Sequence, residues 1–124
     1  MIKTKFTQQE MNKLNEVLGS RLKVSINKAG NVKVVNESES LTHTFWGKWG
    51  HGFWVLYKYD NGTYLWRRHD GTGYSYPLNM KGRKVAEGFE GYRPYNVNMS
   101  LFNSFNEALD YFIKYLNRYR NINL

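Results

Sequence analysis

The chain has 124 residues, no cysteine and a formal net charge of +8, from 18 Lys and Arg against 10 Asp and Glu. The length suits one domain with a single core, and the lack of cysteine excludes disulfides and thiolate-bound zinc. No apolar run reaches the ~20 residues of a membrane-spanning helix. No apolar segment follows the N-terminal lysines, as it would in a signal peptide. We therefore expect one soluble, cytoplasmic domain over residues 1–124 that makes no membrane contact.

The first predicted element is a helix that begins after Thr7. Thr7-Gln8-Gln9-Glu10 has the spacing of a capping box, in which the threonine hydroxyl accepts a hydrogen bond from the Glu10 amide. Apolar residues then recur at helical spacing, at Met11, Leu14, Val17 and Leu18. Gly19 is typical of a helix end. The pattern predicts a helix with one buried stripe.

Alternating apolar and polar residues over 22–35 predict a β-hairpin. A three-residue loop at Ala29-Gly30-Asn31, with Asn31 in the left-handed conformation, would pair Ile26 with Val34. The outer face would then carry Lys23 and Lys33. A further strand is expected over residues 41–46.

Residues 53–69, FWVLYKYDNGTYLWRRH, predict a second hairpin with Asn61-Gly62 as a type I′ turn. Counting outward from a two-residue turn pairs Tyr59 with Tyr64 and Tyr57 with Trp66. One face would then carry Phe53, Val55, Tyr57, Tyr59, Tyr64, Trp66 and Arg68. The other face would carry Trp54, Leu56, Lys58, Leu65, Arg67 and His69.

Two interpretations of this hairpin are open, because both faces carry large apolar side chains. In the first, the face with Tyr57 and Trp66 packs against the helices, as strand aromatics usually do. In the second, that face is an exposed aromatic platform with arginine at its edge, on which nucleobases stack while cations hold the phosphates.

The last part of the chain predicts a strand and a helix. Residues 96–102 are a candidate final strand. Ser104-Phe105-Asn106-Glu107 repeats the capping-box spacing and opens a helix to about Tyr119. The whole order predicts an α+β fold: an N-terminal helix, an antiparallel meander of four to six strands, and a C-terminal helix packed on the sheet.

The basic charge favours a polyanionic partner, and the main hypothesis is a non-enzymatic protein that binds single-stranded DNA or structured RNA without a cofactor. The residues expected to contact phosphates are Lys23, Lys33, Arg67, Arg68, Lys81, Arg83 and Lys84. The residues expected to stack on bases are Tyr57, Tyr59, Tyr64 and Trp66.

Two alternatives remain open. The first is a phage or mobile-element inhibitor of a host nucleic-acid enzyme or ribonucleoprotein, with an anti-CRISPR-like role. Tyr, Trp and Arg dominate protein-binding hot spots, and a chain of charge +8 would dock on an acidic protein or guide RNA rather than mimic DNA. The second is a small metal-dependent nuclease that uses His43, His51, His69 and Asp70, although their spacing matches no metal motif.

Overall fold

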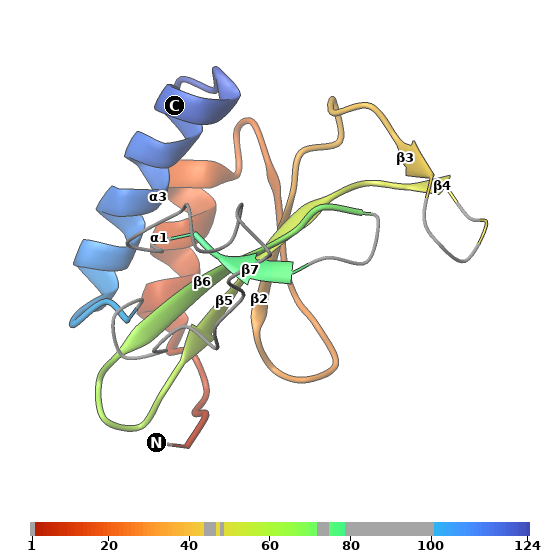
Figure 1. Cartoon of the computed structure of the whole chain (residues 1–124). Helices are drawn as coiled ribbons and strands as arrows, with labels where there is room; N and C mark the ends of the chain where they lie inside the picture. The colour runs from red at the N-terminus through yellow and green to blue at the C-terminus, as the bar shows by residue number, and fades with distance from the viewer. Residues whose placement is uncertain (1, 44–46, 48, 72–74, 79–100) are drawn as a thin grey trace, which may run out of the picture.

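Two helices cover one face of a five-stranded antiparallel sheet in the computed structural model of the chain, which describes residues 2–43, 47, 49–71, 75–78 and 101–124 (Figure 1). The helices are α1 (Gln8–Leu18) and α3 (Phe105–Arg120). The sheet contains, in spatial order, β1 (Lys23–Ile26), β2 (Val32–Val35), β5 (Phe53–Lys58), β6 (Tyr64–His69) and β7 (Ser75–Pro77). The predicted α+β class, with the C-terminal helix on the sheet, is confirmed.

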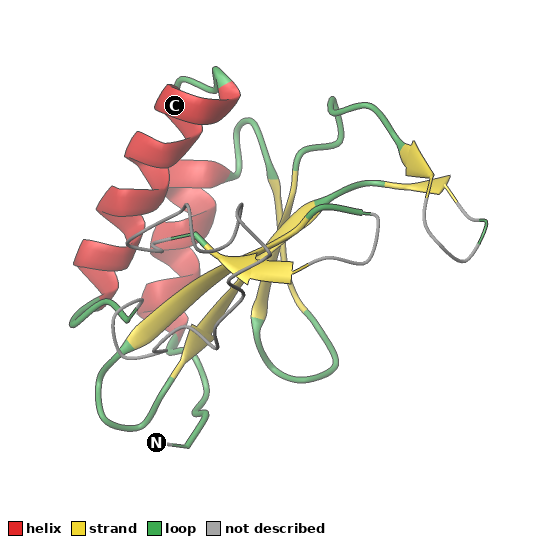
Figure 2. Ribbon diagram, viewed as in Figure 1, coloured by secondary structure: helices red, strands yellow, loops and turns green. Residues whose placement is uncertain are grey.

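A separate two-stranded ribbon joins β3 (Thr42–His43) to β4 (Trp49–Gly50), and we call it the arm. The arm projects away from the helices at one end of the molecule (Figure 2). The strand expected over residues 41–46 is seen here as Thr42–His43 only, since 44–46 lie outside the described residues. The same applies to most of the strand expected at 96–102, of which Phe102 forms a bridge to Tyr64.

Both helices begin as their capping residues predict. The Thr7 hydroxyl accepts from the Glu10 amide at 3.1 Å, and the Glu10 carboxylate accepts from the Thr7 amide at 2.7 Å. The Ser104 hydroxyl likewise accepts from the Glu107 amide at 3.1 Å. These bonds satisfy amide groups that have no partner inside the helix, which fixes each first turn.

The β1–β2 hairpin has the predicted faces but a shifted register. Its loop is Lys28-Ala29-Gly30, with Gly30 at a φ of 83°, so the left-handed residue is Gly30 and the prediction for Asn31 is wrong. Ile26 pairs with Val32 rather than Val34. A shift of two residues leaves every side chain on its expected face, because side chains alternate with a period of two.

The β5–β6 hairpin differs from the prediction by one residue, so each face combines side chains that were expected on opposite faces. The Tyr59 amide donates to the Thr63 carbonyl across a three-residue loop that ends in Gly62, at a φ of 82°. Leu56 therefore pairs with Trp66, where the two-residue turn would have placed Tyr57. A one-residue slip moves every side chain of one strand to the opposite face relative to the other strand. The first interpretation is therefore correct for Tyr64 and Trp66, which pack on the helix side, and wrong for Tyr57, which lies on the opposite face.

We call the side of the sheet that packs on α1 and α3 the first face, and the opposite side the second face. The first face of β5 and β6 carries Trp54, Leu56, Lys58, Tyr64, Trp66 and Arg68. The second face carries Phe53, Val55, Tyr57, Leu65, Arg67 and His69.

The core is built around two fully buried indoles that pack on α3. Phe112 lies parallel to Trp66, with 3.9 Å between ring centroids, and meets Trp54 edge-on at 5.5 Å. The Trp66 indole N–H donates to the Ala108 carbonyl at 2.9 Å, and that of Trp54 donates to the Tyr115 hydroxyl at 3.1 Å. Helix α3 thus satisfies both polar groups while burying both rings.

A cluster of charged side chains lies on the first face, at the end of the sheet nearest the arm. Arg68 is 3% exposed, and its guanidinium lies over the Trp54 ring, 4.6 Å from the centroid. Glu39, in the connection between β2 and β3, accepts from Arg68 at 2.9 Å and from Arg120 at 3.3 Å. One carboxylate therefore ties β6, α3 and the connection to the arm together.

Replacing Glu39 with Gln should lower the free energy of unfolding by about 2 kcal/mol, because two guanidinium groups lose their shared counter-ion and one of them is buried. Urea denaturation measures the change. The matched control is Glu37→Gln, which removes an exposed carboxylate from the same connection and should shift stability by less than about 0.5 kcal/mol. Equal losses in the two variants would contradict the structural role of Glu39.

Candidate functional site

The aromatic platform expected on the hairpin does not form, because three of its members lie on the first face. Trp66 is fully buried, Tyr64 is 6% exposed and Arg68 is 3% exposed. The Tyr64 hydroxyl donates to Glu10, and Arg68 pairs with Glu39. The expectation that these side chains are available to stack on bases or hold phosphates is wrong. The observed register places them beside Trp54 and Leu56 on the buried first face.

The other described members of the predicted site come together on the second face. Lys33 and Arg67 flank Val55 on the two neighbouring strands, because both pair with it. Lys23 lies on the same face of the edge strand β1 and is exposed. Tyr57 on β5 and Tyr59, just after its end, are half-buried. The remaining predicted residues, Lys81, Arg83 and Lys84, lie outside the described residues.

A stack of three side chains crosses this face. The Lys33 ammonium lies 4.4 Å from the centroid of the Phe53 ring, a cation–π contact, and the His69 imidazole stacks on Phe53 at 4.6 Å and 8°. Sequence reasoning missed this stack, because the two-residue turn sets Phe53 opposite Asp70 rather than His69. The aromatic ring here positions a cation and an imidazole.

Positive charge dominates the strand residues of the second face that the structure describes. None of the strands β1, β2, β5, β6 and β7 contains Asp or Glu. Arg67 is oriented by its Nε, which donates to the Ser75 hydroxyl at 2.8 Å. The face therefore presents oriented cations at a spacing of about two strand widths, roughly 10 Å between the backbones of Lys33 and Arg67.

This environment disfavours the protonated form of His69. Burial is the main cause that lowers the pKa of His69, and the charges of Arg67 and Arg68 act in the same direction. Lys33 lowers the pKa further, and Asp70 opposes it. The Nε2 atom of His69 is buried and has no hydrogen-bond partner. A proton on Nε2 would meet neither solvent nor an acceptor, which agrees with the direction of the shift.

The residues considered for a metal-dependent nuclease do not form a metal site in the part of the chain that the structure describes. No three His, Asp or Glu side chains there come close enough to hold a metal ion. His43 instead packs against Trp49 on the arm, with 5.0 Å between ring centroids. His69 is engaged with Phe53.

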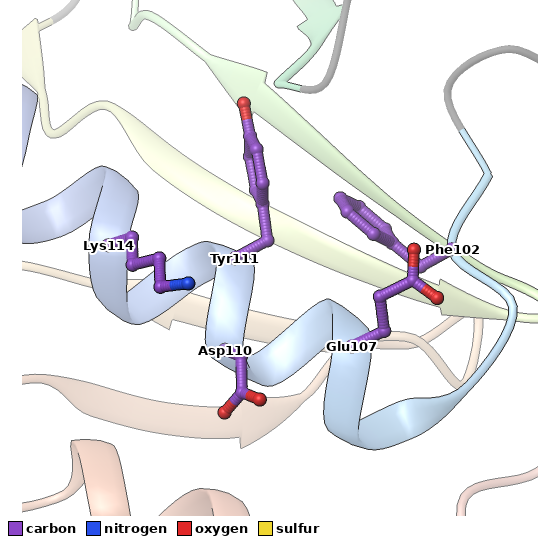
Figure 3. A pocket seen from close by; sticks show the side chains of 5 residues that line it. All are labelled: Phe102, Glu107, Asp110, Tyr111 and Lys114. Atoms are coloured by element: carbon purple, nitrogen blue, oxygen red, sulfur yellow. The ribbon is translucent and has the colours of Figure 1, made fainter.

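A hollow of about 510 Å³ beside α3 is a weaker candidate (Figure 3). The described residues that line it are Phe102, Glu107, Asp110, Tyr111 and Lys114. The carboxylates of Glu107 and Asp110 point in opposite directions (Figure 3), and Glu107 already accepts from the Asn103 amide at 3.2 Å. Tyr111 donates to the Leu78 carbonyl at 3.3 Å. These groups serve the fold and do not converge on a ligand.

No family model matches the chain, and neither a curated protein nor a solved structure matches it. In the described residues, no helix combines the length and the apolar character that crossing a membrane requires. The geometry and charge of the second face are therefore the features of this molecule that bear on its function.

The lowered pKa of His69 predicts a loss of stability in acid. The unfolded chain takes up a proton near the ordinary value of about 6.5, whereas the folded state resists it to lower pH. The stabilisation is complete above that value and is lost as the pH falls through the pKa of the folded state, with a slope below about 1.4 kcal/mol per pH unit.

Urea denaturation of the wild type and of His69→Gln at a series of pH values from about 7.5 to about 5 measures this effect. The wild type should lose more free energy of unfolding than the variant over that range. The variant can be less stable at every pH, because it lacks the stack on Phe53, so the slopes are compared. Parallel curves would show that His69 has no shifted pKa.

Proposed function

We propose that this protein binds nucleic acid without catalysis, through the second face of its sheet, with Lys23, Lys33 and Arg67 contacting phosphates. The observation that carries the proposal is the absence of any carboxylate from the five strands, combined with oriented cations on one face. A net charge of +8 supports the same class of partner.

The use of acidic residues elsewhere in the fold strengthens this proposal. The first-face cations Lys58 and Arg68 each have a carboxylate partner, Glu10 at 2.7 Å and Glu39 at 2.9 Å. Those carboxylates come from α1 and from the connection after β2. These two carboxylates thus lie on the helix side of the sheet, and the charged side chains that the five strands supply to the second face are all basic.

The geometry favours recognition of the phosphate backbone over base stacking on the sheet. Tyr64 and Trp66 are core residues, and Phe53 is already in contact with Lys33 and His69. Phosphate contacts carry no sequence information, and each one releases counter-ions when it forms. Binding by this face should therefore be tolerant of sequence and strongly weakened by salt.

Replacing Lys33 with Gln should reduce the slope of log K against log salt by about one unit, because one phosphate contact is lost. Fluorescence anisotropy of labelled single-stranded DNA, duplex DNA and RNA at about 50 to 200 mM salt measures the slope. Lys33→Arg keeps the charge over Phe53 and should retain the wild-type slope.

The matched control is Lys13→Gln, which removes an exposed lysine from α1 on the opposite side of the sheet and should leave the slope unchanged. Equal effects of Lys33→Gln and Lys13→Gln would mean that net charge alone drives binding, and would refute this face as the site. An unmeasurable affinity of the wild type for all three nucleic acids at the lowest salt would refute the function and favour the inhibitor alternative.

A further inference from the structure

The arm carries the most accessible tryptophan among the described residues. Trp49 is 67% exposed, whereas Trp54 and Trp66 are fully buried. One neighbour restricts the ring. His43, its direct partner across the arm, packs against it with 5.0 Å between ring centroids and 58° between the ring planes. The fold therefore holds a large aromatic side chain in solvent without covering it.

Trp49 lies close to the cations of the second face. Only Gly50, His51 and Gly52 separate it from Phe53, which contacts Lys33 and stacks on His69. Because an extended chain advances at most about 3.5 Å per residue, the two backbones are within roughly 14 Å of each other. A strand of nucleic acid that lies on Lys33 can therefore reach the arm.

The charge around the arm suits the same ligand. No Asp or Glu occurs between Leu41 and Tyr59. The carboxylate that precedes the arm most closely is Glu39, which is paired with Arg68 and Arg120. A polyanion that approaches the arm therefore meets no acidic residue of the arm itself.

We propose that Trp49 stacks on an unpaired nucleobase of a strand whose phosphates lie on the second face. This inference rests on the proposed function and narrows it to single-stranded nucleic acid or unpaired segments. The neighbours of Trp49 favour a base over a broad apolar partner. Among the described residues of the arm, Trp49 offers one accessible indole ring, and a flat base covers such a ring without needing a wider apolar surface.

The experiment compares two labelled oligonucleotides that differ only in their bases. One is oligothymidylate of about 16 nucleotides, and the other is an abasic strand of the same length with the same phosphates. Affinities for the wild type, Trp49→Ala and Trp49→Tyr are measured by anisotropy at about 50 and about 200 mM salt. Tyr119→Ala is the matched control, since Tyr119 is also exposed, at 54%, but lies on α3.

The wild type and Tyr119→Ala should prefer oligothymidylate over the abasic strand by about 5- to 100-fold, at both salt concentrations, because stacking is not screened. Trp49→Ala should lose that preference and keep its affinity for the abasic strand. Trp49→Tyr should retain most of the preference, because a smaller aromatic ring still stacks.

Each other outcome points to a distinct failure. If the wild type binds both strands equally, the proposed phosphate-binding function stands and base stacking by Trp49 is refuted. If the wild type prefers oligothymidylate and Trp49→Ala keeps that preference, another residue stacks, and the role of Trp49 is refuted. If the wild type binds neither strand, the proposed function and this inference both fail.

Discussion

The pairing of β5 with β6 is the constraint on which the rest of the structure depends. The three-residue loop that ends in Gly62 places Leu56 opposite Trp66, and this register brings Trp54 and Trp66 to one face. Helix α3 can then cover both indoles with Phe112 and accept both of their N–H groups. The same register creates the second face, because it sets Phe53 directly against His69. A hairpin shifted by one residue would mix core aromatics with surface cations on each side.

The parts of this fold that could be predicted from sequence depend on local signals. Thr7 and Ser104 mark the two helix starts because capping is settled within four residues. The faces of the β1–β2 hairpin survive an error of two residues in register because alternation has a period of two. The second hairpin has neither a local capping signal nor a clear alternation of polar and apolar residues. Both of its faces are apolar, and Gly62 at positive φ suits a two-residue or a three-residue loop, so alternation cannot select the register.

The candidate site was predictable to the same limited extent. Lys23 and Lys33 could be placed on the outer face of their hairpin because charged and apolar residues alternate there. The side on which Tyr64 and Trp66 lie could not be settled from sequence, because it depends on the register across a turn. The stack of Phe53 on His69 carries no sequence pattern, since it joins residues on two strands that only the folded sheet aligns. Local patterns therefore identify charges more readily than contacts between strands.

The position of α3 in the chain has a consequence for synthesis. The hydrogen bond from Trp54 to Tyr115 spans 61 residues, and the one from Trp66 to Ala108 spans 42. A ribosome therefore makes the whole sheet before it makes the helix that covers the two indoles. During that interval α1 is the one described helix that can shield the apolar side of the nascent chain. Unpaired indoles on an uncovered sheet are the kind of surface that aggregates or recruits chaperones. The two indoles can therefore be buried, and the risk of aggregation reduced, only after α3 has emerged from the ribosome.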